Sequence, residues 1–153
     1  PEWSVIALCC DNHGIAVSME EKVEIGCALI EEAEKYGVMP ERIHIDPLVL
    51  ALSAVNTAAV SFCDAVRKLK EKFPSVHITA ALSNVSYGMP VRRIVNQNFL
   101  TLAMEAGLDS VIADPLRREI IETIYAAEAL LGKDRLCRKY NSAYRAGKIG
   151  PVK

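Results

Sequence analysis

The segment Ala80-Ala81-Leu82-Ser83-Asn84-Val85-Ser86-Tyr87-Gly88-Met89-Pro90 is the part of this chain from which its architecture is inferred. The apolar run from His77 to Leu82 has the length of a buried strand, and it stops at Ser83-Asn84. A loop with Gly88 follows, and a helical pattern begins near Pro90. Polar residues that end a buried parallel strand lie at the mouth of an α/β fold, where such folds bind ligands. Ser and Asn also start ordinary loops, so Asn84 is either a ligand contact or a turn residue.

The remaining sequence shows the same strand–loop–helix order. Strands are expected at 3–10, 42–45, 77–82 and 110–113, with helices at 18–36, 57–72, 90–106 and 116–131. Strands that alternate with helices predict a parallel sheet with right-handed crossovers, in one domain that spans residues 1–153.

Helix boundaries follow from local chemistry. Ser18 and Glu21 have the spacing of a capping box, and the first helix is expected to bury its apolar positions. These positions are Val23, Cys27, Ile30 and Ala33. Asp134 is expected to cap a last short helix that ends near Ala146, and residues 148–153 are expected to form a frayed tail.

Each predicted strand ends in a polar residue. In chain order these are Asp11 (beside Asn12 and His13), Asp46, Asn84 (beside Ser83) and Asp114. Parallel strands place their carboxyl ends on one face, so the four residues are expected to converge around a common mouth. None of them is Lys or Arg, and GxGxxG and Walker motifs are absent, so a neutral ligand rich in hydrogen bonds fits better than a phosphate. Asp-Pro pairs at 46–47 and 114–115 also suit turns or helix N-caps, and that alternative stays open.

Composition and charge narrow the function classes. Hydrophobic residues make up 51% of the 153 residues, charged residues 24%, and the net charge is -1. These values are typical of a soluble globular domain and imply no general attraction to nucleic acid or to an acidic membrane. No apolar run approaches the roughly 20 residues that span a bilayer. Five cysteines lack metal-ligand spacing, so we expect no metal site and mostly buried, reduced thiols in a cytoplasmic protein: Cys9, Cys10, Cys27, Cys63 and Cys137.

Arg92 and Arg93 are placed unusually. Both fall near the start of a predicted helix, where positive side chains oppose the helix dipole. This placement indicates that at least one of them faces a ligand or a partner.

Two groups of residues together resemble a known family. The run Leu82-Ser83-Asn84-Val85-Ser86 is followed by Arg92 and by the segment 96–100, and the chain also contains Ile45-Asp46-Pro47-Leu48 and the segment 107–114. This pattern resembles the methyltetrahydrofolate:corrinoid methyltransferases, which belong to the pterin-binding, dihydropteroate-synthase-like group of (β/α)8 barrels. The likeness covers nearly the whole chain, and LSNVS combined with IDPL at this separation is a specific signal.

The resemblance implies an incomplete barrel. It matches strands five to eight, the second half of the TIM barrel, whereas a complete barrel needs roughly 200 residues or more. The first four strands, which in the family bring further contacts to the pterin, are not present in this sequence. Four parallel strands alone leave two unpaired edges and an uncovered inner face. We therefore expect a half-barrel, either a fragment or a piece that pairs with a second copy as a homodimer.

The resemblance also assigns roles to individual residues. In the family, a methyl group passes between N5 of 5-methyltetrahydrofolate and the Co(I) corrinoid (cobalamin) of a separate protein or domain, so no metal is expected on this chain. Asn84 matches the family's hydrogen-bonding group at N5, and Asp46 matches the aspartate that binds the amino-pyrimidine edge of the pterin. Asp11 stands where the family has Asn or Asp at the end of strand five, so the resemblance implies a further contact to the substrate from this residue. Three secondary contacts are expected from Ser83, Ser86 and Arg92.

Tyr87 is a departure from part of the family. Some acetogen-type members carry Gln at this position, whereas members closer to the demethylation and methionine-synthase types resemble this chain. The physiological direction is therefore open, and methyl transfer onto tetrahydrofolate is one of the two expectations.

Two functions other than corrinoid methyl transfer are also considered from the sequence. A dihydropteroate synthase would bind a pyrophosphate leaving group with Lys and Arg near the late strands, but the predicted third strand ends in Ser83-Asn84 and Asp114 lacks the expected basic motif. The other alternative is a non-catalytic half-barrel that serves as a binding or assembly module. Pterin binding separates this module from the methyltransferase.

Overall fold

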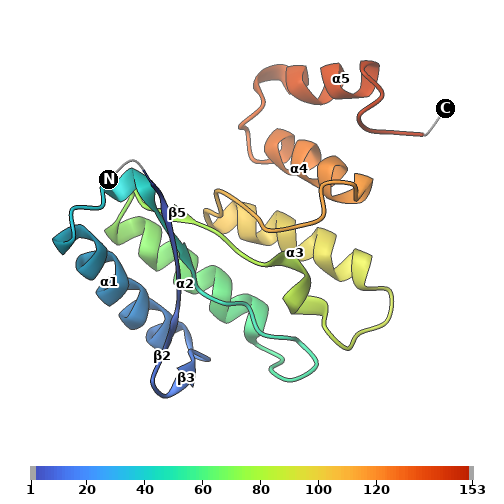
Figure 1. Ribbon diagram of the computed structural model, residues 1–153. Helices are drawn as coiled ribbons and strands as arrows, with labels where there is room; N and C mark the ends of the chain where they lie inside the picture. The colour runs from blue at the N-terminus through green and yellow to red at the C-terminus, as the bar shows by residue number, and fades with distance from the viewer. Residues whose placement is uncertain (1–2, 152–153) are drawn as a thin grey trace.

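The computed structural model describes residues 3–151 as a parallel sheet with helices packed on one of its faces (Figure 1). The three strands pair in the order β1 (Val5–Leu8), β4 (Ile43–Asp46) and β5 (His77–Ile78). Leu8 lies opposite Asp46, and His44 lies opposite His77. The α/β class and the parallel pairing expected from the alternating pattern are thus confirmed for three strands.

The helices follow one another in chain order across the molecule (Figure 1). Their bounds are α1 (Met19–Lys35), α2 (Ala58–Lys72), α3 (Arg92–Ala106), α4 (Arg118–Leu130) and α5 (Arg138–Arg145). Each of the first four packs against the next, and α5 lies farthest from α1 (Figure 1). Short 3₁₀ helices occur at η1 (Pro40–Arg42), η2 (Leu82–Ser86) and η3 (Arg135–Cys137).

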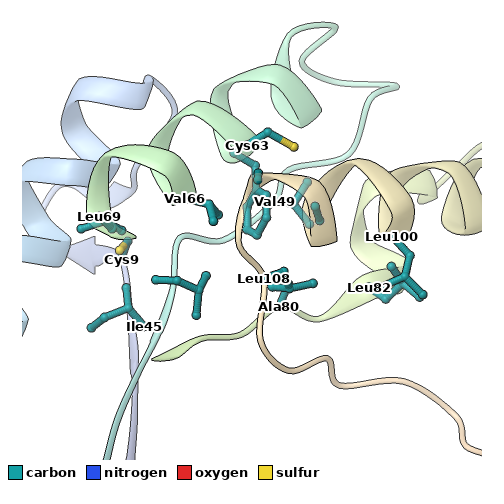
Figure 2. Packing of buried hydrophobic residues seen from close by; sticks show 14 of the residues in the cluster. Cys9, Ile45, Val49, Cys63, Val66, Leu69, Ala80, Leu82, Leu100 and Leu108 are labelled. Carbon is teal, nitrogen blue, oxygen red and sulfur yellow. The ribbon is translucent and has the colours of Figure 1, made fainter. Parts of the chain in front are cut away.

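The core lies between the sheet and the first three helices. Ile43 and Ile45 of β4 are fully buried, and Figure 2 shows Leu69 of α2 beside Cys9 and above Ile45. Phe62 of α2 meets Phe99 of α3 edge to face, with 5.4 Å between ring centroids. This apolar contact packs α2 against α3.

The start of α1 has the predicted capping box, but the buried stripe of the helix is rotated from the predicted one. The Ser18 hydroxyl accepts the Glu21 N–H at 3.2 Å, and the Glu21 carboxylate accepts the Ser18 N–H at 3.0 Å. The buried residues of the helix are Lys22, Gly26 and Ile30, whereas Val23 and Cys27 are only partly buried. A Cβ on Gly26 would lie 3.0 Å from Leu69, so the small residue permits the close approach of α1 and α2.

Two predicted strands are shorter than expected. The strand expected at 77–82 ends at Ile78, and the LSNVS run forms η2 because Leu82 and Val85, three residues apart, both turn into the core. The strand expected at 110–113 is reduced to a parallel bridge between Ala81 and Ile112, since it pairs with an already irregular neighbour.

The first predicted strand also needs correction. Only Val5–Leu8 form β1, and the chain then turns into a small antiparallel hairpin of β2 (Cys10–Asp11) and β3 (Gly14–Ile15). The hairpin was not among the elements expected from the sequence, which placed one strand at 3–10. Gly14 has φ 119°, a backbone conformation that suits the tight hairpin turn.

One face of the sheet is open to solvent. Ile6 and Leu8 of β1 are 53% and 46% exposed, and Ile112 is 55% exposed. On the same face of the neighbouring strands, the rings of His44 and His77 stack with centroids 4.9 Å apart. Exposed apolar side chains therefore lie on this face of the sheet at Ile6, Leu8 and Ile112.

The expectation of a frayed tail from 148 onward is wrong for the residues that the structure describes. Ile149 is buried, and the Gly150 N–H donates to Glu122 at 3.0 Å. The Arg118 guanidinium donates to the carbonyls of Gly147 and Gly150. The carboxylate of Asp134 accepts two backbone N–H groups in the first turn of α5, so its predicted capping role is confirmed. Residues 152 and 153 lie outside the described part.

The expectation for the cysteines is only partly right. All five are free, and Cys9 and Cys63 are buried as expected, whereas Cys10 and Cys137 are exposed and Cys27 is half-buried. Burial raises the pKa of the Cys9 thiol to about 12 and that of the Cys63 thiol to about 11. These two thiols are therefore inert packing groups.

Candidate functional site

The side chain of Asn84 is presented on a short, well-held turn. It lies in the middle of η2, flanked by Leu82 and Val85, which are buried in the core. The Asn84 residue is exposed, and no hydrogen bond joins its side-chain amide to any described residue. The turn is therefore anchored from below by apolar side chains, while its amide remains available to a ligand.

Arg92 fixes the shape of this turn. Its Nε donates to the Ser86 hydroxyl at 3.0 Å, and its Nη2 donates to the Ser83 carbonyl at 2.6 Å. Ser86 is fully buried, and its hydroxyl donates to the Ser83 carbonyl at 3.3 Å. The guanidinium also lies 6.0 Å from the centre of the Tyr87 ring. Three of the residues selected from the sequence, Ser83, Ser86 and Arg92, thus form one hydrogen-bonded unit around Asn84.

Asp46 ends β4 at the level of this turn and is only 2% exposed. One of its carboxylate oxygens accepts the Leu48 N–H at 2.8 Å, so the alternative of an Asp-Pro turn is realised. Burial raises the pKa of the Asp46 carboxyl, opposed by the backbone N–H groups of Leu48 and Ala81 and by the Lys22 ammonium. Such a carboxylate gains from any ligand that donates to it.

Lys22 holds the Asp46 loop in place, a role that was not predicted from the sequence. This lysine of α1 is 1% exposed, and its ammonium donates to the carbonyls of Ala16, Pro47 and Leu48 at 2.7, 2.8 and 2.8 Å. Leu48 has φ 55°, a left-handed conformation that is costly for a leucine. Burial lowers the pKa of the Lys22 ammonium, and the neighbouring acidic groups Cys9, Asp46 and Glu21 oppose this shift. The lysine therefore stabilises a strained segment directly after Asp46.

Further contacts join the Asp46 loop to the Asn84 turn. The Leu52 N–H donates to the Val85 carbonyl at 3.0 Å, and the Ser53 hydroxyl donates to the Tyr87 carbonyl at 2.8 Å. Together with the Ala81 N–H that faces the Asp46 carboxylate, these bonds place the two segments side by side. The predicted convergence is therefore found for Asp46 with the Ser83–Ser86 turn.

Asp11 and Asp114 are less closely joined to this pair. Asp11 is exposed in the hairpin, where its carboxylate accepts the His13 N–H at 2.7 Å, and it lines a hollow with Glu21 of α1. The Asp114 carboxylate accepts the Leu116 N–H at 2.9 Å, which is again an Asp-Pro turn. Asp114 shares a cavity with Ser83. The four strand ends therefore do not form one closed ring in the described residues.

The Asp46 loop and the Asn84 turn together present groups that can bind a particular kind of ligand. A neutral amide that can donate or accept stands beside a buried carboxylate that accepts, which suits a heterocycle with a ring nitrogen and an amino-pyrimidine edge. Between residues 3 and 151, no group of three or more His, Cys, Asp or Glu side chains is arranged to hold a metal ion. None of the helices described over the same residues is long and apolar enough to cross a bilayer.

Comparison with known proteins agrees with this capacity. Residues 10–114 match the family model described as "Pterin binding enzyme". The chain is 49% identical over 152 residues to the methylcorrinoid:tetrahydrofolate methyltransferase of Eubacterium limosum, covering 99% of this chain and 56% of that protein. It is 36% identical over 116 residues to the methionine synthase of Mycobacterium leprae and 35% identical to that of Mycobacterium tuberculosis, covering 71% of this chain and 10% of each synthase.

The chain thus spans about half the length of the first of these relatives. The matched family segment contains Asp46, the Asn84 turn and Arg92, and it ends at Asp114. These findings confirm the resemblance inferred from LSNVS and IDPL. The chain belongs to the pterin binding enzyme family.

Proposed function

We propose that this single pterin-binding domain transfers a methyl group between N5 of 5-methyltetrahydrofolate and the Co(I) corrinoid of a partner protein. The best support is the side-chain amide of Asn84, which has no hydrogen-bond partner among the described residues. The turn that carries it is held by the bond between Arg92 and Ser86 and lies beside the buried Asp46. The names of the three relatives, which mention methylcorrinoid, tetrahydrofolate and methionine synthesis, support the same reaction.

Asn84 acts at the reacting nitrogen. The corrinoid supplies the methyl acceptor or donor, so the chain itself has to manage the charge on N5. A tertiary amine is a poor leaving group, and a hydrogen bond from the Asn84 amide stabilises the nitrogen as its bond to carbon breaks. An amide donates without carrying a charge of its own, and its fixed position avoids reorganisation during the transfer.

Asp46 binds the pterin. Its carboxylate accepts the N–H donors of the amino-pyrimidine edge, and these bonds are charge-assisted. Because burial raises the pKa of this carboxyl, the ionised form is costly until the ligand donates to it. N–H groups of a bound ligand therefore lower the pKa of Asp46. They also fill acceptor positions on the carboxylate that have no donor in the free protein. Asp11 and Ser83 are the further pterin contacts that we propose.

We propose methyl transfer onto tetrahydrofolate as the physiological direction. The Eubacterium limosum relative, at 49% identity, is named as a methylcorrinoid:tetrahydrofolate methyltransferase. Tyr87, whose ring lies near the Arg92 guanidinium, stands where some acetogen-type members of the family carry Gln, and in this respect the chain resembles the demethylation type. Corrinoid-bound methyl is then the donor and N5 of tetrahydrofolate the acceptor.

We also propose that a second half-barrel completes the pocket. The exposed apolar face that contains Ile6, Leu8 and Ile112 is where the missing strands of a (β/α)8 barrel would lie. We propose a second copy of this chain as the partner that covers the face, giving a homodimer.

Binding and turnover test the proposal together. The protein is titrated calorimetrically with 5-methyltetrahydrofolate and, separately, with pterin pyrophosphate, and the loss of Co(I) absorbance is followed after mixing with free cobalamin. Binding of the folate with methyl transfer is the expected result. Preference for the pyrophosphate would instead favour a dihydropteroate synthase, and binding of neither would contradict the proposed function.

A further inference from the structure

A closed chain of hydrogen bonds joins the base of the β2–β3 hairpin to the loop after β4. The Cys9 N–H donates to the Asp46 carbonyl at 2.9 Å, and the Ala16 N–H donates to the Cys9 carbonyl at 3.3 Å. The Lys22 ammonium completes this chain, because it donates to the Ala16 carbonyl at 2.7 Å and to the Pro47 carbonyl at 2.8 Å. The backbone that carries Asp46 is therefore tied to the hairpin at two successive residues.

The hairpin and the loop each carry one of the proposed pterin contacts. Asp11 lies in β2, and Asp46 is the last residue of β4. Lys22 bridges them from the first turn of α1, where its backbone N–H donates to the carbonyl of the N-cap residue Ser18 at 3.2 Å. Because the cap fixes where the helix begins, it also fixes the point from which the lysine side chain reaches the two segments.

Lys22 also brings a buried positive charge to the neighbourhood of a buried carboxylate. Three side chains that ordinarily carry a charge are buried in the described part of the chain, namely Lys22, Asp46 and Asp134. Asp134 caps α5, which lies at the far end of the row of helices from α1 (Figure 1). No direct ion pair joins Lys22 to Asp46, but each charge favours the charged form of the other against the cost of burial.

Two other titratable side chains interact with Lys22, and neither takes the place of Asp46. Burial raises the pKa of the Cys9 thiol to about 12, so this thiol is neutral at pH 7. The Glu21 carboxylate accepts two backbone N–H groups in the exposed capping box. The Ala81 N–H that faces the Asp46 carboxylate carries no formal charge. The positive charge that acts on Asp46 therefore comes from Lys22.

We propose that Lys22 is a positioning residue for the methyl transfer, whose ammonium holds the Asp46 loop against the hairpin and supplies the positive charge that keeps the Asp46 carboxylate ready to accept the pterin. The inference rests on the proposed function, because it takes Asp46 as the pterin acceptor. Lys22 is only 1% exposed, so a ligand does not reach it. Its effect on the substrate passes through Asp46 and appears in folate affinity rather than in the rate of the step at Asn84.

The first test measures the affinity for 5-methyltetrahydrofolate by calorimetry as a function of pH, in the wild type, in Lys22→Met and in the exposed control Lys68→Met. Loss of the ammonium raises the pKa of Asp46 further, so its carboxyl stays protonated to a higher pH. Lys22→Met should bind about threefold to tenfold more weakly at pH 7, and the pH below which affinity falls should be higher than in the wild type. The titration of the ligand itself is common to all three proteins. At saturating folate the single-turnover rate should stay within about twofold of the wild type, because the change lies in ground-state binding.

A second variant separates the charge of Lys22 from its mechanical role. Leu48 has φ 55°, which glycine adopts readily, so a lysine that only held this strained backbone would be dispensable in Leu48→Gly. We expect Lys22→Met/Leu48→Gly to bind folate about threefold to tenfold more weakly than Leu48→Gly alone, with the same displacement of the pH profile. Circular dichroism at the temperature of the titration confirms that each variant is folded.

A double-mutant cycle shows whether Lys22 acts through Asp46. In an Asp46→Asn background, Lys22→Met should weaken folate binding less than about twofold further, because the carboxylate that the ammonium serves is gone. A loss of the same size in both backgrounds would overturn the inference, and so would equal pH profiles for Leu48→Gly and Lys22→Met/Leu48→Gly. Either result leaves the proposed function intact. Failure of the wild-type protein to bind folate at any pH would overturn the proposed function, and the inference with it.

Discussion

Replacement of Lys22 by methionine tests whether a buried charge holds the loop that contains Asp46. Methionine fills a similar volume, so the loss consists mainly of three hydrogen bonds, to the carbonyls of Ala16, Pro47 and Leu48. Each charge-assisted bond contributes about 1.5–3 kcal/mol, and the three carbonyls lose their partner while buried. Release of the ammonium from a buried site offsets a large part of this sum, as the lowered pKa of Lys22 indicates.

We therefore expect Lys22→Met to lower the free energy of unfolding by about 3 kcal/mol, which corresponds to a fall in Tm of about 6–12 °C for a domain of this size. Urea unfolding followed by circular dichroism measures the change. Lys68→Met, at a lysine of α2 whose side chain is 57% exposed, is the matched control. A difference below about 0.5 kcal/mol between the two variants would refute the role of Lys22, since surface substitutions stay within that range.

The same variant has a characteristic pH dependence. Burial lowers the pKa of Lys22 in the folded state, so between that pKa and the ordinary value of 10.5 the unfolded chain binds more protons. The stability of the wild type should therefore rise with pH within this window, and that rise should be absent in Lys22→Met. Parallel pH profiles of the two proteins would contradict this explanation.

Four further predictions concern the site and the open face. Asp46→Asn should weaken 5-methyltetrahydrofolate binding at least about tenfold by calorimetry, because charge-assisted bonds are lost; an unchanged Kd would leave Asp46 as a turn residue. Burial raises the pKa of Asp46 in the folded state, so the folded protein binds more protons than the unfolded chain between 3.8 and that raised pKa. The Tm of the wild type should therefore fall as pH rises through this window, and the fall should be absent in Asp46→Asn. Arg92→Lys should slow methyl transfer about tenfold in a stopped-flow assay, since lysine cannot bond Ser86 and the Ser83 carbonyl in the same geometry; a wild-type rate would rule out that positioning role. Ile6→Glu should convert a dimer to monomers in light scattering, and an unchanged mass would show that this face is not the interface.

Much of the site was predictable because its signals are local. The capping box at Ser18, the strand that ends at Asp46 and the turn after Leu82 each depend on residues close together in the chain. The side-by-side placement of Asp46 and the Asn84 turn follows from parallel strands, whose carboxyl ends share one edge.

The features that were missed depend on distant partners. The many charged residues around Lys22 in the sequence suggest a solvated side chain. The structure buries it because carbonyls from two separate loops surround its ammonium. One signal was present: Lys22, Gly26 and Ile30 are spaced by four, which places them on one helix face. The 3₁₀ conformation of LSNVS was missed for a different reason. Leu82 ends an apolar run that fits a strand, and the residues after it fit a loop, so the turn that buries Leu82 and Val85 together has no separate signal.

The role of Asn84 is the foundation of the proposed reaction, and a single-turnover rate measures it. The assay mixes the protein and saturating 5-methyltetrahydrofolate with Co(I) cobalamin and follows the loss of Co(I) absorbance for the wild type and for Asn84→Ala. We predict transfer in the wild type and a rate lower by about 10²-fold or more in the variant, the scale for removing one preorganised donor, with little change in folate affinity. Equal rates in the two proteins, or no transfer by the wild type, would contradict the proposed chemistry.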